Sequence, residues 1–136
     1  MTCGQKVLIV EDDSIIAGVY RRYLCQAGYE VEIANDGLKA LERLVEFRPD
    51  AVVLDFMLPH LNGIEVLKKI RALNDFMTLP VLVITTAFVA NVIKDSIASG
   101  ATQVVNKMNF TPPLLVVALR DLLSNAGKPL DDPAVA

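Results

Sequence analysis

The sequence predicts a single α/β domain in which a doubly wound parallel sheet carries helices on both faces. Five short apolar runs recur along the chain, and a segment with the apolar spacing of an amphipathic helix follows each run. Strands that alternate with helices in this way pair in parallel through right-handed crossovers. The length of 136 residues, of which 53% are hydrophobic, suits one domain with its own core and excludes a disordered chain.

The expected strands are short runs rich in β-branched residues. The first is continuous and apolar, as a strand covered on both faces should be. Prolines stand close before the third and fourth runs and help to mark where they begin. The five expected strands are residues 7–10, 31–33, 51–54, 81–84 and 102–105.

The expected helices lie between these runs and have clear start and stop signals. Asp13 or Ser14 can cap the first helix, and Gly28 can end it. Thr111 precedes two prolines at the start of the last helix, where a missing N–H group has little effect. The five expected helices are residues 14–27, 37–47, 64–73, 89–99 and 114–123.

The composition argues against several classes of protein. A net charge of −3, from 13 basic and 16 acidic residues, gives no electrostatic support for nucleic-acid binding or membrane binding. The start of the chain lacks the apolar run of a signal peptide, and the longest uncharged stretch, residues 76–93, is broken by Pro80 and polar residues. We therefore expect a cytoplasmic protein without membrane insertion. We also expect its two cysteines, Cys3 and Cys25, to be reduced and partly buried.

Polar side chains follow four of the five expected strands at the point where each strand ends. Because the carboxyl ends of parallel strands meet at one edge of a sheet, we expect these groups to form a common site. In chain order they are Glu11, Asp12 and Asp13, then Asp55, then Thr85 and Thr86, then Asn106 and Lys107.

The chemistry of these groups indicates a magnesium site. Asp55 ends an apolar run and precedes Phe56, so its carboxylate requires a charged partner. Lys107, flanked by residues 104–105 and Met108, requires an anion. Carboxylates gathered at one edge repel one another unless a lysine or a divalent cation neutralises them. Oxygen ligands without histidine or cysteine favour Mg²⁺ over zinc. Asp13 can equally serve as a helix cap, and we expect His60 to be an exposed turn residue.

Four segments then reveal a family resemblance. Residues 7–13, 49–63, 80–85 and 100–101, the last followed by Lys107, resemble the receiver domain of two-component response regulators, in the same order and at the same spacing. The resemblance covers residues 5–124 and implies a flavodoxin-like (βα)5 fold with strand order 2-1-3-4-5. We expect residues 125–136 to be a tail or the start of a linker.

The resemblance also implies a role for each site residue. Asp55 would accept a phosphoryl group from a histidine kinase or a histidine phosphotransfer protein. Asp12 would bind Mg²⁺ directly, Glu11 would hold it through water, and Met57 would offer its backbone carbonyl. Thr85 and Lys107 would contact the phosphoryl group. Such a domain catalyses only its own phosphorylation and dephosphorylation, and signals to a downstream effector through its fourth helix, fifth strand and fifth helix.

Three positions depart from the usual receiver pattern. Val104 replaces an aromatic residue on the fifth strand, and Thr86 replaces a smaller residue after Thr85. Met108 follows Lys107 where receivers usually have a proline in a cis peptide. Since a cis bond without proline costs about 3–4 kcal/mol, we expect a trans Lys107–Met108 bond and a rearranged loop.

These departures keep an alternative open, namely an interaction module that has the receiver shape but works without phosphorylation. An enzyme acting on a separate substrate is less well supported. A phosphatase of the haloacid dehalogenase type would need an acid where Met57 stands. A flavodoxin would need a phosphate-binding loop after the first strand, where the acidic residues would repel a phosphate.

Overall fold

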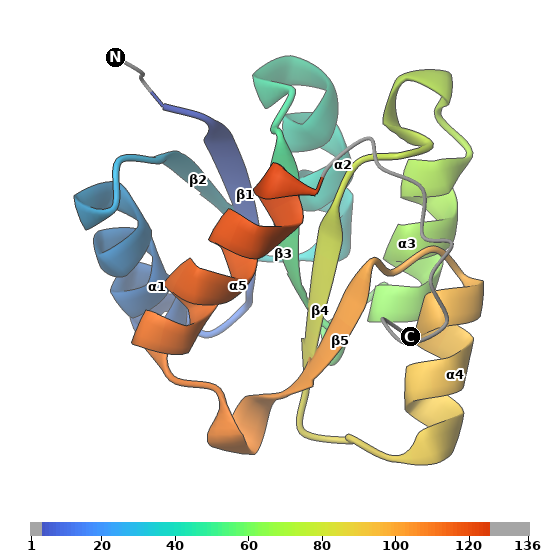
Figure 1. The fold of residues 1–136 in the computed structure, drawn as a ribbon. Coiled ribbons are helices and arrows are strands. Elements are labelled where there is room, and N and C mark those ends of the chain that lie inside the picture. The colour runs from blue at the N-terminus through green and yellow to red at the C-terminus, as the bar shows by residue number, and fades with distance from the viewer. Residues whose placement is uncertain (1–3, 126–136) are drawn as a thin grey trace.

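The fold is a five-stranded parallel sheet between two layers of helices. The computed structural model describes residues 4–125. The strands are β1 (Lys6–Val10), β2 (Glu30–Ala34), β3 (Ala51–Asp55), β4 (Val81–Thr85) and β5 (Gln103–Asn106). They lie in the order β2-β1-β3-β4-β5, with every neighbouring pair parallel (Figure 1). The predicted fold class and strand order are confirmed.

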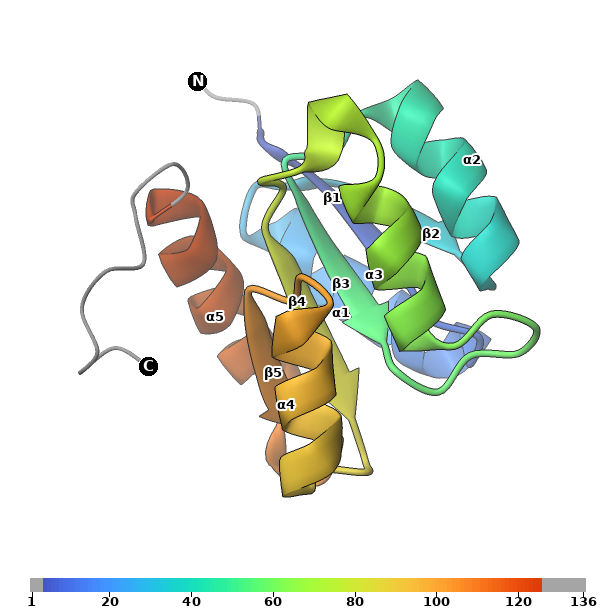
Figure 2. The same cartoon turned by 90° about the vertical axis from the view of Figure 1, so that its right-hand side faces the viewer.

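Five α-helices connect the strands, within one or two residues of the predicted bounds at most ends. They are α1 (Ser14–Gln26), α2 (Gly37–Phe47), α3 (Gly63–Arg71), α4 (Ala90–Ala98) and α5 (Pro112–Ser124). Helices α1 and α5 cover one face of the sheet, while α2, α3 and α4 cover the other (Figure 2). Two short 3₁₀ helices were not predicted: η1 (Asn74–Phe76) and η2 (Lys107–Asn109).

The strands are apolar throughout because both faces of the sheet are buried. In β1, Val7 and Ile9 belong to the cluster that includes Leu24 and Leu115 from α1 and α5, whereas Leu8 belongs to the cluster on the other face. Successive side chains of a strand point to opposite faces, so a continuous apolar run supplies both clusters. The core is therefore two layers with the sheet between them.

The local signals at the helix ends act largely as expected. Asp13, rather than Ser14, caps α1: its Oδ1 accepts hydrogen bonds from the backbone N–H groups of Ile15 (3.0 Å) and Ile16 (3.2 Å). Gly28, just beyond the helix, has φ of +100°, a conformation that favours glycine. The Thr111 side chain accepts from the backbone N–H of Leu114 at the start of α5.

The strand register brings the carboxyl ends of four strands to one edge. Val10 pairs with Leu54, so the residues that come next, Glu11 and Asp55, lie side by side. Asp55 in turn pairs with Ile84, the neighbour of Thr85. Asn106, which precedes Lys107, pairs with Thr85. The polar groups predicted from the strand ends therefore share this edge.

Two further expectations concern local structure. All peptide bonds among residues 4–125 are trans, including Lys107–Met108. The chain from Lys107 forms the 3₁₀ helix η2, where the Asn106 side chain accepts from the N–H of Met108 at 3.0 Å.

The prediction of a partly buried Cys25 is wrong: Cys25 is exposed, because Leu24 takes the buried position and the next residue turns outward. Cys3 lies outside the described residues. Of the helices the structure describes, none is long and apolar enough to cross a membrane.

Candidate functional site

The centre of the site is a partly buried lysine held between two buried carboxylates. The Lys107 Nζ donates to Asp55 Oδ2 and to Glu11 Oε1, each at 3.0 Å. Asp55 is 5% exposed and Glu11 is 3% exposed, so both charges lie away from water. The structure pairs Asp55 with Lys107, as expected, and gives the lysine Glu11 as a second partner among the carboxylates of this edge.

The electrostatics of this cluster follow from burial and from the charge balance. Burial, together with the neighbouring charge of Asp55, raises the pKa of Glu11 to about 7, although the hydrogen bond from Lys107 opposes the shift. Burial alone would lower the pKa of Lys107, but its hydrogen bonds to Asp55 and Glu11 outweigh burial and raise it. Two carboxylates therefore share one permanently charged ammonium group, and the site can accept more positive charge.

A third carboxylate completes an oxygen-rich group at the same place. Glu11, Asp12 and Asp55 each offer a carboxylate oxygen, and these oxygens lie within 4.8 Å of one another. Asp12 is exposed, so the group is open to solvent on one side. The backbone N–H of Met57 donates to Asp55 Oδ1 at 3.1 Å, which places the Met57 backbone beside the cluster while its side chain is 58% exposed.

The surface beside Glu11 is hollowed on the α1–α2 side. A hollow of about 330 Å³ opens beside Glu11 and extends to residues at the starts of α1 and α2. Its lining includes the polar side chains of Ser14, Asn35 and Lys39. Of the three carboxylates, Glu11 is the one that lines this hollow.

Thr85 connects the site to the segment that precedes α4. It is fully buried at the end of β4, and its Oγ1 accepts a hydrogen bond from the backbone N–H of Ala87 at 2.9 Å. Among the described residues, its hydroxyl makes no hydrogen bond to Asp55. Thr86 is exposed, so its side chain points away from the buried core of the sheet.

Other candidates have structural roles. Asp13 caps α1, and its own N–H donates to Glu11 Oε2 at 3.1 Å, which orients that carboxylate. The Asn106 side chain caps η2 by accepting a hydrogen bond from the backbone N–H of Met108. Among the described residues, it makes no hydrogen bond to the carboxylates. His60 is exposed in the loop after β3 with φ of +70°, as expected of a turn residue.

The sequence did not indicate Tyr20 of α1 as a neighbour of the site, but it lies close enough for the charges of the site to affect its pKa. Tyr20 is 5% exposed and packs in the cluster beneath the strand ends. Burial raises the pKa of the Tyr20 phenol, the charge of Lys107 opposes this, and the charges of Glu11 and Asp55 add to it. Tyr20 lies in the core cluster on the α1 and α5 side of the sheet, and its proximity to the site depends on how α1 packs against the strands.

Comparison with known proteins agrees with this geometry. The sequence model of the response regulator receiver domain matches residues 7–120. The response regulator MprA of Mycobacterium avium is 38% identical over 127 residues, which cover 93% of this chain and 54% of that protein. The chain thus spans about half the length of this relative.

Solved structures share the fold over nearly all of the chain. The chemotaxis response regulator CheY4 of Vibrio cholerae superposes with a TM-score of 0.82 at 33% identity, covering 89% of this chain and 99% of that one. The receiver domain of the sensor histidine kinase PA1611 from Pseudomonas aeruginosa, with a magnesium ion coordinated in its active site cleft, has a TM-score of 0.81 at 26% identity and covers 90% and 99%. With this fold, this edge of the sheet and this sequence match, the chain belongs to the response regulator receiver domain family of two-component signal transduction.

Proposed function

We propose that this domain is a phosphorylation switch whose acceptor is Asp55. The observation that carries the proposal is the arrangement of Asp55 itself: a carboxylate 5% exposed, paired with Lys107 at 3.0 Å and surrounded by two further carboxylates. A phosphoryl group on the Asp55 carboxylate would lie beside the ammonium group of Lys107, at the edge of the sheet where the strands end. The phosphoryl donor would be a histidine kinase or a histidine phosphotransfer protein.

The carboxylates fit Mg²⁺ as the resident cation. All the available side-chain ligands are oxygens, which Mg²⁺ prefers, and the cluster has an exposed side where the ion can keep several waters. Glu11, Asp12 and Asp55 would hold it with the backbone carbonyl of Met57. The magnesium ion in the PA1611 receiver supports this assignment. When bound, Mg²⁺ supplies positive charge against the phosphoryl oxygens.

The chain's own residues would perform the remaining tasks of phosphoryl transfer. An Asp55 carboxylate oxygen attacks phosphorus, the P–N bond of the donor phosphohistidine breaks, and the imidazole leaves with the bonding electron pair. Lys107 pairs with a phosphoryl oxygen and the Thr85 hydroxyl donates to another, which stabilises the charge that spreads over these oxygens in the transition state. Hydrolysis of the acyl phosphate returns the carboxylate and releases inorganic phosphate.

The signal would leave the site through Thr85. Its hydroxyl already accepts from Ala87 at 2.9 Å, so a shift of Thr85 toward a phosphoryl group draws the segment before α4 with it. The face formed by α4, β5 and α5 would then present a changed surface to an effector. We further propose that the receiver domain spans residues 5–124, that residues 125–136 are a tail or linker, and that the protein works in the cytoplasm.

Intact-protein mass spectrometry after incubation with acetyl phosphate tests this function. We expect one added phosphoryl group in the presence of Mg²⁺, and none after chelation of Mg²⁺ or in Asp55→Asn. The matched control is Asp50→Asn, which changes an aspartate at the opposite end of β3 and should leave the adduct intact. An adduct that forms equally well in Asp55→Asn would refute the proposal. No adduct in the wild type would favour the phosphorylation-independent module.

A further inference from the structure

Helix α4 is the helix with the weakest anchorage on the sheet. Ser96 is its only fully buried residue, whereas every other α-helix of residues 4–125 buries at least three. The Ser96 hydroxyl has no hydrogen-bond partner although it is 0% exposed. An element with so little buried apolar surface is the kind of element that opens or shifts at low free-energy cost.

The C-terminal end of α4 is closed by a tight backbone motif. Gly100 has φ of +118°, its N–H donates to the Ile97 carbonyl at 3.0 Å, and the N–H of Ala101 donates to the Ser96 carbonyl at 2.9 Å. This pair of bonds around a left-handed glycine is the Schellman motif. It fixes how the chain leaves α4 and enters β5.

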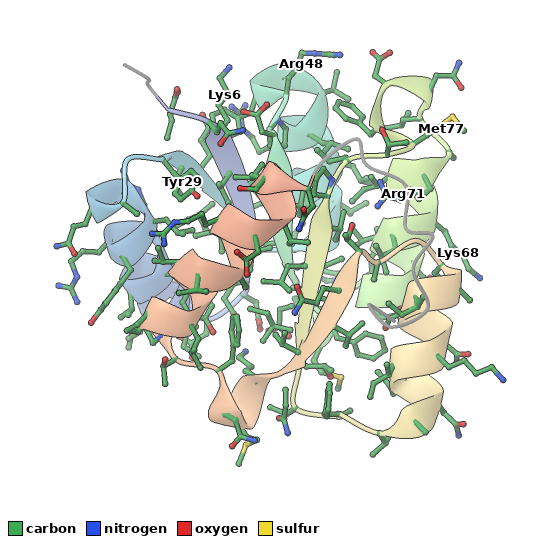
Figure 3. All side chains as sticks on the ribbon, viewed as in Figure 1. Lys6, Tyr29, Arg48, Lys68, Arg71 and Met77 are labelled. Carbon is green, nitrogen blue, oxygen red and sulfur yellow. The ribbon has the colours of Figure 1, made fainter. Side chains whose placement is uncertain are left out.

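Arg71, the last residue of α3, holds this motif from outside. Its Nε and Nη2 donate to the Gly100 carbonyl at 3.1 and 2.6 Å, and its Nη1 donates to the Phe76 carbonyl in η1 at 2.7 Å. No carboxylate of residues 4–125 lies within ion-pair distance of Arg71. Figure 3 shows Arg71 on the α3 side of the sheet. A Cβ at residue 100 would come within 2.7 Å of the Arg71 side chain, so glycine is required there for this contact as well as for its φ.

The N-terminal end of α4 has no comparable restraint. Its N-cap residue, Val89, makes no side-chain capping bond, and Phe88 and Val89 are 40% and 56% exposed. The segment before it is tied to the site through the bond from Ala87 N–H to Thr85. This end of α4 lies at the edge of the sheet where the site is, and the end held by Arg71 lies farther from it (Figure 1).

We propose that Arg71 is a positioning residue that fixes the C-terminal end of α4, so that this helix tilts about its Gly100 end when the segment before it moves. The proposal rests on the proposed function for the cause of that movement, but the restraint itself exists without phosphorylation. Without Arg71, the Gly100 end would be free to move with the rest of the helix. A phosphoryl group at Asp55 would then shift α4 as a whole instead of tilting it.

The restraint is tested first in the unphosphorylated protein by amide hydrogen exchange measured with NMR. In Arg71→Gln and in Gly100→Ala, we expect the amides of residues 99–101 to exchange at least about tenfold faster, since bonds from a charged donor are lost. Arg71→Lys retains one donor and should be intermediate. The matched control is Lys68→Gln, which removes an exposed charge from the same helix and leaves the bonds from Arg71 in place. Unchanged exchange in Arg71→Gln would overturn the proposal, whatever the result in Gly100→Ala, because alanine is strained at the φ of residue 100 even without Arg71.

The tilt is tested by NMR shift changes on adding beryllofluoride, a phosphoryl mimic. In the wild type we expect the changes within α4 to be concentrated at Ala90 to Ile93, and in Arg71→Gln to extend to Ile97 and Ala98. Equal changes at both ends of α4 in the wild type, or the same pattern in the variant, would refute the pivot. If beryllofluoride leaves the neighbours of Asp55 unshifted in the wild type, the proposed function fails and the pivot with it. The exchange experiment still decides whether Arg71 holds the helix end.

Discussion

Replacement of Lys107 by methionine should show how much the lysine charge stabilises the two buried carboxylates of the site. Methionine keeps the length and the apolar stem of the side chain but removes the ammonium group that bonds to Glu11 and Asp55 at 3.0 Å each. Two buried carboxylates then face each other with oxygens within 4.8 Å. With an effective dielectric constant of about 20, their repulsion at that distance is about 3 kcal/mol, which is within the range for loss of one partner of a buried ion pair.

The loss of unfolding free energy in Lys107→Met should depend on pH, because Glu11 can take up a proton. Its folded-state pKa is raised from 4.5 to about 7, so protonation favours the folded state, and the free energy of unfolding falls as pH rises through this interval. Removing Lys107 raises this pKa further. We therefore expect Lys107→Met to lower the unfolding free energy by about 3 kcal/mol at pH 8 but by only about 1–2 kcal/mol at pH 5.5, where lost hydrogen bonds remain.

Urea unfolding followed by circular dichroism at the two pH values measures this effect. Saturating Mg²⁺ at pH 8 should restore part of the loss, because the cation replaces the missing positive charge. Lys68→Met, at an exposed position on α3, is the control and should show neither the loss nor the dependence on pH (Figure 3). An equal loss at both pH values, with no response to Mg²⁺, would mean that Lys107 acts through packing and that the electrostatic reasoning is wrong.

Three further predictions concern the cap, the unpaired hydroxyl and the cation. Asp13→Ala should lower the unfolding free energy by about 1 kcal/mol through loss of the α1 cap, while the acetyl phosphate adduct still forms; loss of the adduct would place Asp13 in the site. Ser96→Ala should leave the unfolding free energy unchanged or raise it by up to about 1 kcal/mol, since the buried hydroxyl has no partner; a clear decrease in urea unfolding would contradict this. Because Glu11 must lose its proton, Mg²⁺ affinity by titration calorimetry should fall about tenfold from pH 8 to pH 6, and Glu11→Gln should abolish the change; a pH-independent affinity would count against Glu11 as part of the cation site.

Much of the site could be predicted from the sequence because its parts stand at strand ends. Asp55 and Lys107 are 52 residues apart, but each follows an apolar run and each has an unbalanced charge. Parallel pairing then brings them to one edge, as it does Glu11 and Thr85. The pair of hydrogen bonds from Lys107 to both acids depends on side-chain conformation and has no signal in the sequence.

The features that could not be predicted are those set by contacts between distant segments. Arg71 bonds to backbone carbonyls, which any residue can provide, so the sequence does not show where its partners lie. The strand β5 begins one residue later than expected, at Gln103, and the Thr102 hydroxyl accepts from the N–H of Val81 instead. The exposure of Cys25 depends on how α1 is rotated about its axis, because a step of one residue along a helix turns a buried position into an exposed one.

The identity of the phosphorylated residue is the most direct test of the account. After incubation with acetyl phosphate and Mg²⁺, borohydride converts an aspartyl phosphate into homoserine, and tandem mass spectrometry of the peptide that spans β3 locates the change. We expect homoserine at residue 55 and at none of the other acidic residues of the site. Homoserine at residue 12 or 13, or none at all in protein that carries a phosphoryl adduct, would contradict the assignment of Asp55 and the roles of Lys107 and Thr85 built around it.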